Sequence, residues 1–246
     1  MQKKEEILES FKTAIKSTIK SISNKDDIEI SFGGQDISSE DNKLRLPEIN
    51  EYKNKINFDL TRAQADSESL RLRYCNKRVL KNFEPDGSKA KKLYEIAEKI
   101  RYESLGIQEY KGIKDNLIAY YEKQKPPQNK TENIYFAFEN YLRKEFFKYE
   151  GKLKIEEISS KFKKSFDKAF KTKIIKIKEN ISKQEIFNEA ISEIIKSLEI
   201  EETSDYEEMD NKKEDDNNKE VSNKEDSDQK KESKFDENQE MAIDTS

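Results

Sequence analysis

Residue types that carry chemistry are scarce in this chain of 246 residues. It has no histidine and one cysteine, Cys75, which excludes an internal disulfide, a Cys/His zinc site and catalysis by a histidine base. With no histidine to activate it, Cys75 is better explained as a packed thiol than as a nucleophile. Adjacent acids such as Asp26-Asp27 and Glu156-Glu157 point in different directions, which indicates solvated charges rather than a catalytic pair. We therefore expect no catalytic, cofactor-binding or metal-binding residues in this chain.

Nucleotide hydrolysis is equally poorly supported by the sequence. Gly33-Gly34 is the one glycine pair that follows a strand-like stretch. No Gly-x-x-x-x-Gly-Lys-Ser/Thr pattern occurs anywhere in the chain, so the pair predicts a simple turn rather than a phosphate loop.

The charges divide the chain into a basic body and an acidic end. Residues 199–246 carry 19 acidic and 7 basic residues, a net charge of −12, whereas residues 1–198 carry 33 acidic and 41 basic residues, a net charge of +8. The acidic end has few apolar side chains to bury, so we predict a disordered tail over residues 199–246. Such a tail acts as a solvated tether or docks onto a basic surface, of a partner or of the body itself.

Neither nucleic acid nor a membrane is an expected partner. The lysines are scattered along polar helix faces without interleaved aromatic residues, and no nucleic-acid-binding motif is present. No apolar stretch approaches the ~20 residues that cross a bilayer, and no signal sequence follows Met1. These features predict a reduced, cytoplasmic protein.

The elements that must position any site are mostly helices. An apolar stripe from Leu8 to Ile22 predicts a one-sided helix, and alternation at Ile28 and Ile30 predicts a short half-buried strand. Residues 36–55 are expected to form an extended loop. The fold class is therefore mainly α, with one short β-strand or hairpin near residues 28–32 and the disordered acidic tail.

Further helices follow on both sides of a proline pair. A helix with small seam residues is predicted from Phe58 to Tyr74, and the next is expected to end at a left-handed Gly106. Pro126-Pro127 is the best internal boundary, which gives three regions: 1–125, 126–198 and 199–246. Aromatic and aliphatic stripes in the second region are typical of helix faces that pack in a core.

Five blocks of residues 28–117 resemble, in order and spacing, the N-terminal region of the CobT subunit family of the aerobic, ATP-dependent cobaltochelatase. The blocks are Ile28–Gly34 (IEISFGG), Leu44–Pro47 (LRLP), Arg62–Ser67 (RAQADS) with Leu70–Leu72 (LRL), Ala97–Gly106 (AEKIRYESLG) and Gly112–Leu117 (GIKDNL). In that family a von Willebrand A-type domain with an Asp-x-Ser-x-Ser metal site follows. No such motif occurs in this chain, so that site is carried over to no residue, and a shortened chain, a split chain and a fragment are all left open.

The resemblance implies a non-catalytic subunit of an enzyme that inserts cobalt(II) into hydrogenobyrinic acid a,c-diamide during cobalamin biosynthesis. Its implied partners are an AAA+ CobS-type subunit and a large CobN-type subunit. ATP, Mg²⁺ and cobalt would be used by these partners rather than bound by this chain. Self-association into a homo-oligomer is left open.

The residues to test as partner contacts are polar side chains in the family-like helices: Arg62, Asp66, Arg71 and Arg101. Their alternative role is surface charge or pairing within the chain, and Arg62 and Asp66 are spaced to pair with each other. Two other functions remain open. One is an adaptor of a different AAA+ and von Willebrand A-type remodelling pair, and the other is a stand-alone helical adaptor.

Overall fold

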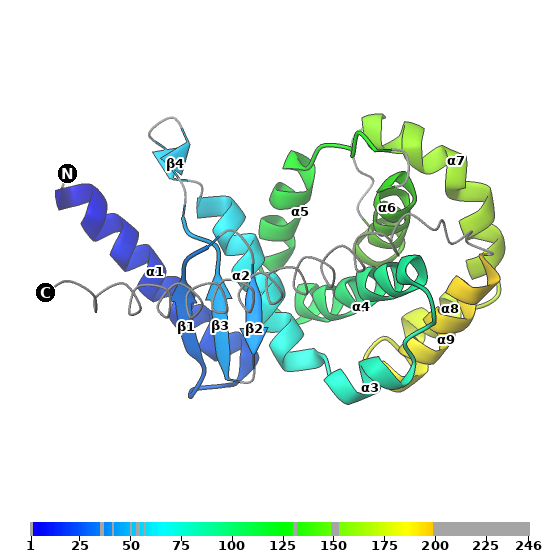
Figure 1. Cartoon of the computed structure of the whole chain (residues 1–246), viewed down its shortest axis with the longest axis horizontal. Coiled ribbons are helices and arrows are strands. Elements are labelled where there is room, and N and C mark those ends of the chain that lie inside the picture. Colours follow the sequence, from blue (N-terminus) through cyan, green and yellow to red (C-terminus); the bar gives the residue numbers. More distant parts are fainter. Residues whose placement is uncertain are drawn as a thin grey trace, which may run out of the picture. The chain divides into compact units, whose positions relative to one another are not determined.

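The computed structural model describes residues 2–34, 37–40, 42–49, 51–52, 55–56, 58–129, 132–148 and 153–198 (Figure 1). Within these ranges the chain is mainly helical, as the sequence predicts. The helices are α1 (Gln2–Ser23), α2 (Phe58–Tyr74), α3 (Lys77–Asn82), α4 (Ser88–Glu109), α5 (Ile113–Lys123), α6 (Asn133–Phe147), α7 (Leu153–Phe170), α8 (Ile174–Glu179) and α9 (Gln184–Ser197). The strands are β1 (Glu29–Phe32), β2 (Ser38–Glu40), β3 (Lys43–Leu46), β4 (Glu51–Tyr52) and β5 (Lys55–Ile56). The tail predicted at residues 199–246 lies outside the described residues.

Helix α1 packs with α2 beside a three-stranded sheet of order β1-β3-β2. Strands β1 and β3 are parallel, with Ile30 opposite Leu44, and β2 runs antiparallel to β3. Ile15 and Ile19 of α1 are buried in one cluster with Leu44 and other strand residues. The expected one-sided helix and the strand near residues 28–32 are both confirmed.

The expectation of an extended loop over residues 36–55 is wrong where β2, β3, β4 and part of β5 form. In β3 exposed and buried residues alternate, and this period-two pattern lets Leu44 and Leu46 face the core while Lys43 and Arg45 face solvent. The pattern is only four residues long, and Pro47 ends it. Two further short strands, β4 and β5, form an antiparallel hairpin.

Helix α4 is the centre of the larger core. Helices α2, α5, α6 and α9 all contact it, and one buried cluster includes Leu93 of α4, Phe138 of α6 and Ile191 of α9 (Figure 1). The stripes predicted in residues 126–198 face this cluster. Pro126-Pro127 therefore separates α5 from α6 within one shared core.

Gly106 does not end α4 in a left-handed conformation, contrary to expectation. The helix continues to Glu109, and the left-handed glycine is Gly112 (φ +95°), which precedes α5. A Cβ atom added to Gly106 would lie 2.3 Å from a methyl carbon of Leu70, a side chain with 0% exposure. Glycine is needed here because α2 and α4 approach each other closely.

Candidate functional site

Helices α2, α4 and α5 bring together three of the family-like blocks. Ala63 and Ser67 are small, buried residues on one face of α2, and they leave room for the neighbouring backbones. Helix α2 contacts both α4 and α5 along this seam, whereas Ala65, on its other face, is buried in the cluster with α1 and the sheet. The blocks at residues 62–72, 97–106 and 112–117, far apart in sequence, thus meet at one place.

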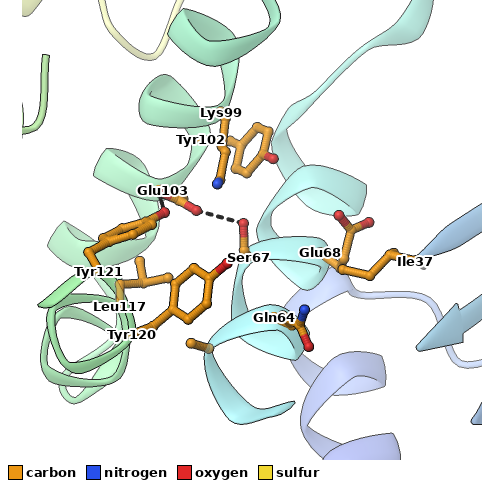
Figure 2. A pocket seen from close by; sticks show the side chains of 11 residues that line it. Ile37, Gln64, Ser67, Glu68, Lys99, Tyr102, Glu103, Leu117, Tyr120 and Tyr121 are labelled. Carbon is orange, nitrogen blue, oxygen red and sulfur yellow. Dashed lines mark hydrogen bonds between the residues drawn. The ribbon is translucent and has the colours of Figure 1, made fainter. Parts of the chain in front are cut away.

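A cleft of about 220 Å³ opens where the three helices meet (Figure 2). Its lining combines polar side chains of α2 with polar and aromatic side chains of α4 and α5. The lining includes Gln64, Ser67, Lys99, Glu103, Tyr120 and Tyr121.

Glu103 forms the buried floor of the cleft. It has 0% exposure, and its Oε1 accepts a hydrogen bond of 2.6 Å from the Ser67 hydroxyl. The hydroxyl of Tyr121 donates to the other carboxylate oxygen. Burial and the neighbouring Glu103 charge raise the pKa of Tyr121 well above its ordinary value, so the phenol stays protonated as a donor. One carboxylate thereby joins all three helices (Figure 2).

A second charged group lies beside this floor. Arg143 of α6 pairs with Glu139 of the same helix and lies over the Tyr121 ring, 3.2 Å from its centroid. Lys99 Nζ is 3.5 Å from Glu139 Oε1. Burial alone would raise the pKa of Glu139, but Arg143 and Lys99 outweigh it and hold that pKa below its usual value. Helix α6 is thus tied to the cleft through charge as well as apolar packing.

Arg101 and Glu98 form an ion pair in the core, on the side of α4 that faces α9. Arg101 Nε and Nη2 donate to the two oxygens of Glu98 at 2.8 and 2.7 Å. The guanidinium also donates to the backbone carbonyls of Tyr74 (2.5 Å) and Ile181 (3.3 Å). Its side chain therefore links the end of α2 to the segment before α9.

A model of the family described as cobalamin biosynthesis protein CobT matches residues 5–246. This chain belongs to the CobT family. The match spans all five sequence blocks and gives the chain a role in cobalamin biosynthesis. No solved structure matches the chain.

Of the four residues proposed as partner contacts in this CobT-family chain, two are buried. Arg101 has 1% exposure and is engaged by Glu98, and Asp66 has 1% exposure and accepts a 2.7 Å hydrogen bond from Asn116. An exposed contact does not fit either of them, because each is already desolvated and has a partner within the chain. Burial raises the pKa of Asp66, although Asn116 and Arg62 oppose the shift.

The other two proposed residues lie near the surface but on different sides of α2. Arg62 is exposed, and it forms no ion pair with Asp66 among the described residues. Arg71 is held by Glu68, with Nη2 2.7 Å from Oε2. Nine residues separate the two arginines, about two and a half helical turns. The two side chains therefore point to opposite sides of α2, and one flat interface cannot include both. Arg71 lies on the same side as Gln64 and Glu68 of the cleft, and Arg62 does not.

Ser67 and Glu103, the central pair of the cleft, were missed as site residues although both lie in family-like blocks. A signal was present in the sequence. The apolar stripe of α4 runs through Leu93, Ala97 and Ile100, and Glu103 continues it at a spacing of three. A carboxylate on a core stripe needs buried donors, which Ser67 and Tyr121 supply.

The arrangement is suited to holding helices in place rather than to bond chemistry. Both oxygens of Glu103 accept hydrogen bonds, and the Ser67 hydroxyl is turned toward that carboxylate. Cys75 lies half-buried, and burial followed by the nearby Glu98 raises its pKa to about 12, so the thiol is protonated at neutral pH. In the part of the chain that the structure describes, no group of three or more Cys, Asp or Glu side chains could hold a metal ion. No described helix is long and apolar enough to cross a membrane.

Proposed function

We propose that this CobT-family chain is the non-catalytic bridging subunit of a cytoplasmic, ATP-dependent cobaltochelatase. An AAA+ CobS-type subunit would hydrolyse ATP with Mg²⁺. A large CobN-type subunit would hold hydrogenobyrinic acid a,c-diamide, into which cobalt(II) is inserted as a substrate. The observation that carries the proposal is the family match over residues 5–246.

The chain's part in the reaction is to transmit a change in the ATPase to the large subunit. Transmission requires that the chain bind the nucleotide states of the AAA+ subunit with different free energies, since a ligand shifts an equilibrium only by its differential affinity. It also requires a body that moves as a unit. The buried contacts of Glu103 and Arg101 support this, because fully satisfied polar networks in a core hold a single arrangement.

We propose that the AAA+ subunit binds the cleft side of α2. Gln64, Glu68 and Arg71 lie along this side, and Lys99 of α4 reaches the same cleft. The ion pair with Glu68 limits the freedom of Arg71, so the guanidinium is already ordered before a partner binds. An ordered side chain loses less entropy on binding than a free one.

The test measures whether the AAA+ and large subunits of the same organism co-purify with the chain, with and without ATP. We expect ATP-dependent binding of the AAA+ subunit and no ATPase or chelatase activity from the chain alone. Arg71→Glu weakens AAA+ binding, and Arg62→Glu, the same charge change on another side of α2, is the matched control. Failure of the wild-type chain to bind the AAA+ subunit in either state, or cobalt insertion by the chain alone, would refute the proposal.

A further inference from the structure

Ile175 is the most exposed large apolar side chain among the described residues, with 67% exposure. It lies in the first turn of α8. That short helix is anchored by the neighbouring Ile177, which has 1% exposure. The position of α8 therefore does not depend on Ile175, whose exposed side chain is available to a partner.

A groove of about 570 Å³ lies between α6 and the end of α7, and one of the residues that line it is Ile174, which precedes Ile175 in the chain. Tyr141, Phe170 and Ile174 give it an apolar floor. It also contains two carboxylates, and each is already engaged by a lysine within the chain. Glu145 is 2.7 Å from Lys178, and Asp167 pairs with Lys163.

The surroundings of the groove are strongly basic. Residues 160–180 include eight lysines and two acidic residues. Lys168, Lys171 and Lys176 are exposed and form no ion pair with any other described residue. The groove therefore has an apolar centre, and positive charges outnumber negative ones around it. We define the α7–α8 surface as Lys168, Lys171, Ile174, Ile175 and Lys176 with the adjoining groove.

We infer that the α7–α8 surface docks an acidic segment of the large chelatase subunit that carries a bulky apolar side chain. This inference rests on the proposed function. A bridging chain needs two separate surfaces, and the α7–α8 surface shares no helix with the cleft of α2, α4 and α5 (Figure 1). Charge complementarity selects an acidic partner, and the exposed isoleucine beside an apolar groove selects a protein segment over a nucleic acid.

Binding of the full-length chain to the large subunit and to the AAA+ subunit is measured for the wild type, for Ile175→Asp, and for Lys168→Glu/Lys171→Glu/Lys176→Glu. The controls are Ile7→Asp on α1, where Ile7 has 49% exposure, and Lys77→Glu on α3. Ile175→Asp and the triple variant each weaken large-subunit binding by about tenfold or more, because a central apolar contact or its charged rim is lost. Both variants keep AAA+ binding and wild-type thermal stability, and both controls bind like the wild type.

Three results would overturn the inference in different ways. Wild-type affinity of both variants for the large subunit would refute the surface while leaving the bridging function intact. A change in the chain's own sedimentation, with large-subunit binding unaltered, would assign the surface to a second copy of the chain. Binding of a single-stranded RNA probe that the variants lose, with large-subunit binding unchanged, would assign it to nucleic acid. A wild-type chain that binds neither subunit would instead refute the proposed function itself.

Discussion

Replacing Arg101 by methionine separates a structural role from an interface role for this residue. Methionine keeps an unbranched apolar side chain but removes every guanidinium hydrogen bond. Glu98, with 3% exposure, is then left as an uncompensated buried charge. The carbonyls of Tyr74 and Ile181 lose their donor at the same time.

The size of the effect follows from these contacts. Breaking a buried ion pair by removing one partner costs about 3–5 kcal/mol of unfolding free energy. For a chain of this size, each kcal/mol corresponds to a fall in Tm of about 2–4 °C. Removing both charges, in Glu98→Gln/Arg101→Met, takes away the buried charge and leaves only the lost carbonyl hydrogen bonds. We therefore expect the double variant to be more stable than Arg101→Met, with a coupling of about 2 kcal/mol.

Urea unfolding of the two single variants and the double variant, followed by circular dichroism, gives the coupling directly. The control is Arg78→Met, an exposed arginine on α3, which changes stability by less than about 0.5 kcal/mol. A stability cost under about 1 kcal/mol for Arg101→Met, together with abolished binding of a partner subunit, would contradict the structural role of Arg101. That result would instead show that Arg101 contacts the partner.

Three further predictions concern packing, thiol reactivity and pH. Gly106→Ala destabilises the chain by about 1–3 kcal/mol despite alanine's higher helix propensity, because the added Cβ atom overlaps Leu70. Thermal melts measure this loss. In a Leu70→Ala background the overlap is absent, so the Gly106→Ala penalty is smaller there. Burial and the nearby Glu98 raise the pKa of Cys75 to about 12. We therefore expect Cys75 to react with iodoacetamide at pH 8 about a thousand-fold more slowly in the folded chain than in urea. Similar rates in the two states would refute the burial of this thiol. Glu139→Gln destabilises the chain at pH 7. The pKa of Glu139 is lower in the folded chain than in the unfolded chain, where it is about 4.3. The penalty of Glu139→Gln is therefore fully present above about pH 4.3 and shrinks as the pH falls toward the folded-state pKa. Urea unfolding of the wild type and the variant at pH 7 and pH 3 measures this change.

The helical part of the fold could be predicted from sequence because the apolar stripes are long. Ile15 and Ile19, and likewise Phe138 and Leu142, recur at helical spacing over several turns and are buried as expected. The strand pairing at Lys43–Leu46 could not be predicted, because four alternating residues beside a proline give too short a signal. Its partner is set by tertiary packing of Leu44 against Ile15 and Ile19.

The site was harder to predict than the fold, for two physical reasons. Arg101 and Asp66 are charged, and charged residues usually lie on the surface; only the structure shows donors and acceptors that compensate their burial. Gly106 resembles a helix terminus in sequence, since a glycine that permits a left-handed turn and a glycine that permits close approach look alike. The contact with Leu70, 36 positions earlier in the chain, decides between them.

The most direct test of the bridging account is the affinity of the full-length chain for the AAA+ subunit in its ATP-bound and ADP-bound states. The account predicts dissociation constants that differ by about fivefold or more, which is the lower end of functional coupling between sites. Equal affinity for the two states would contradict it, because a chain that does not distinguish them can transmit no free energy of ATP hydrolysis to the large subunit.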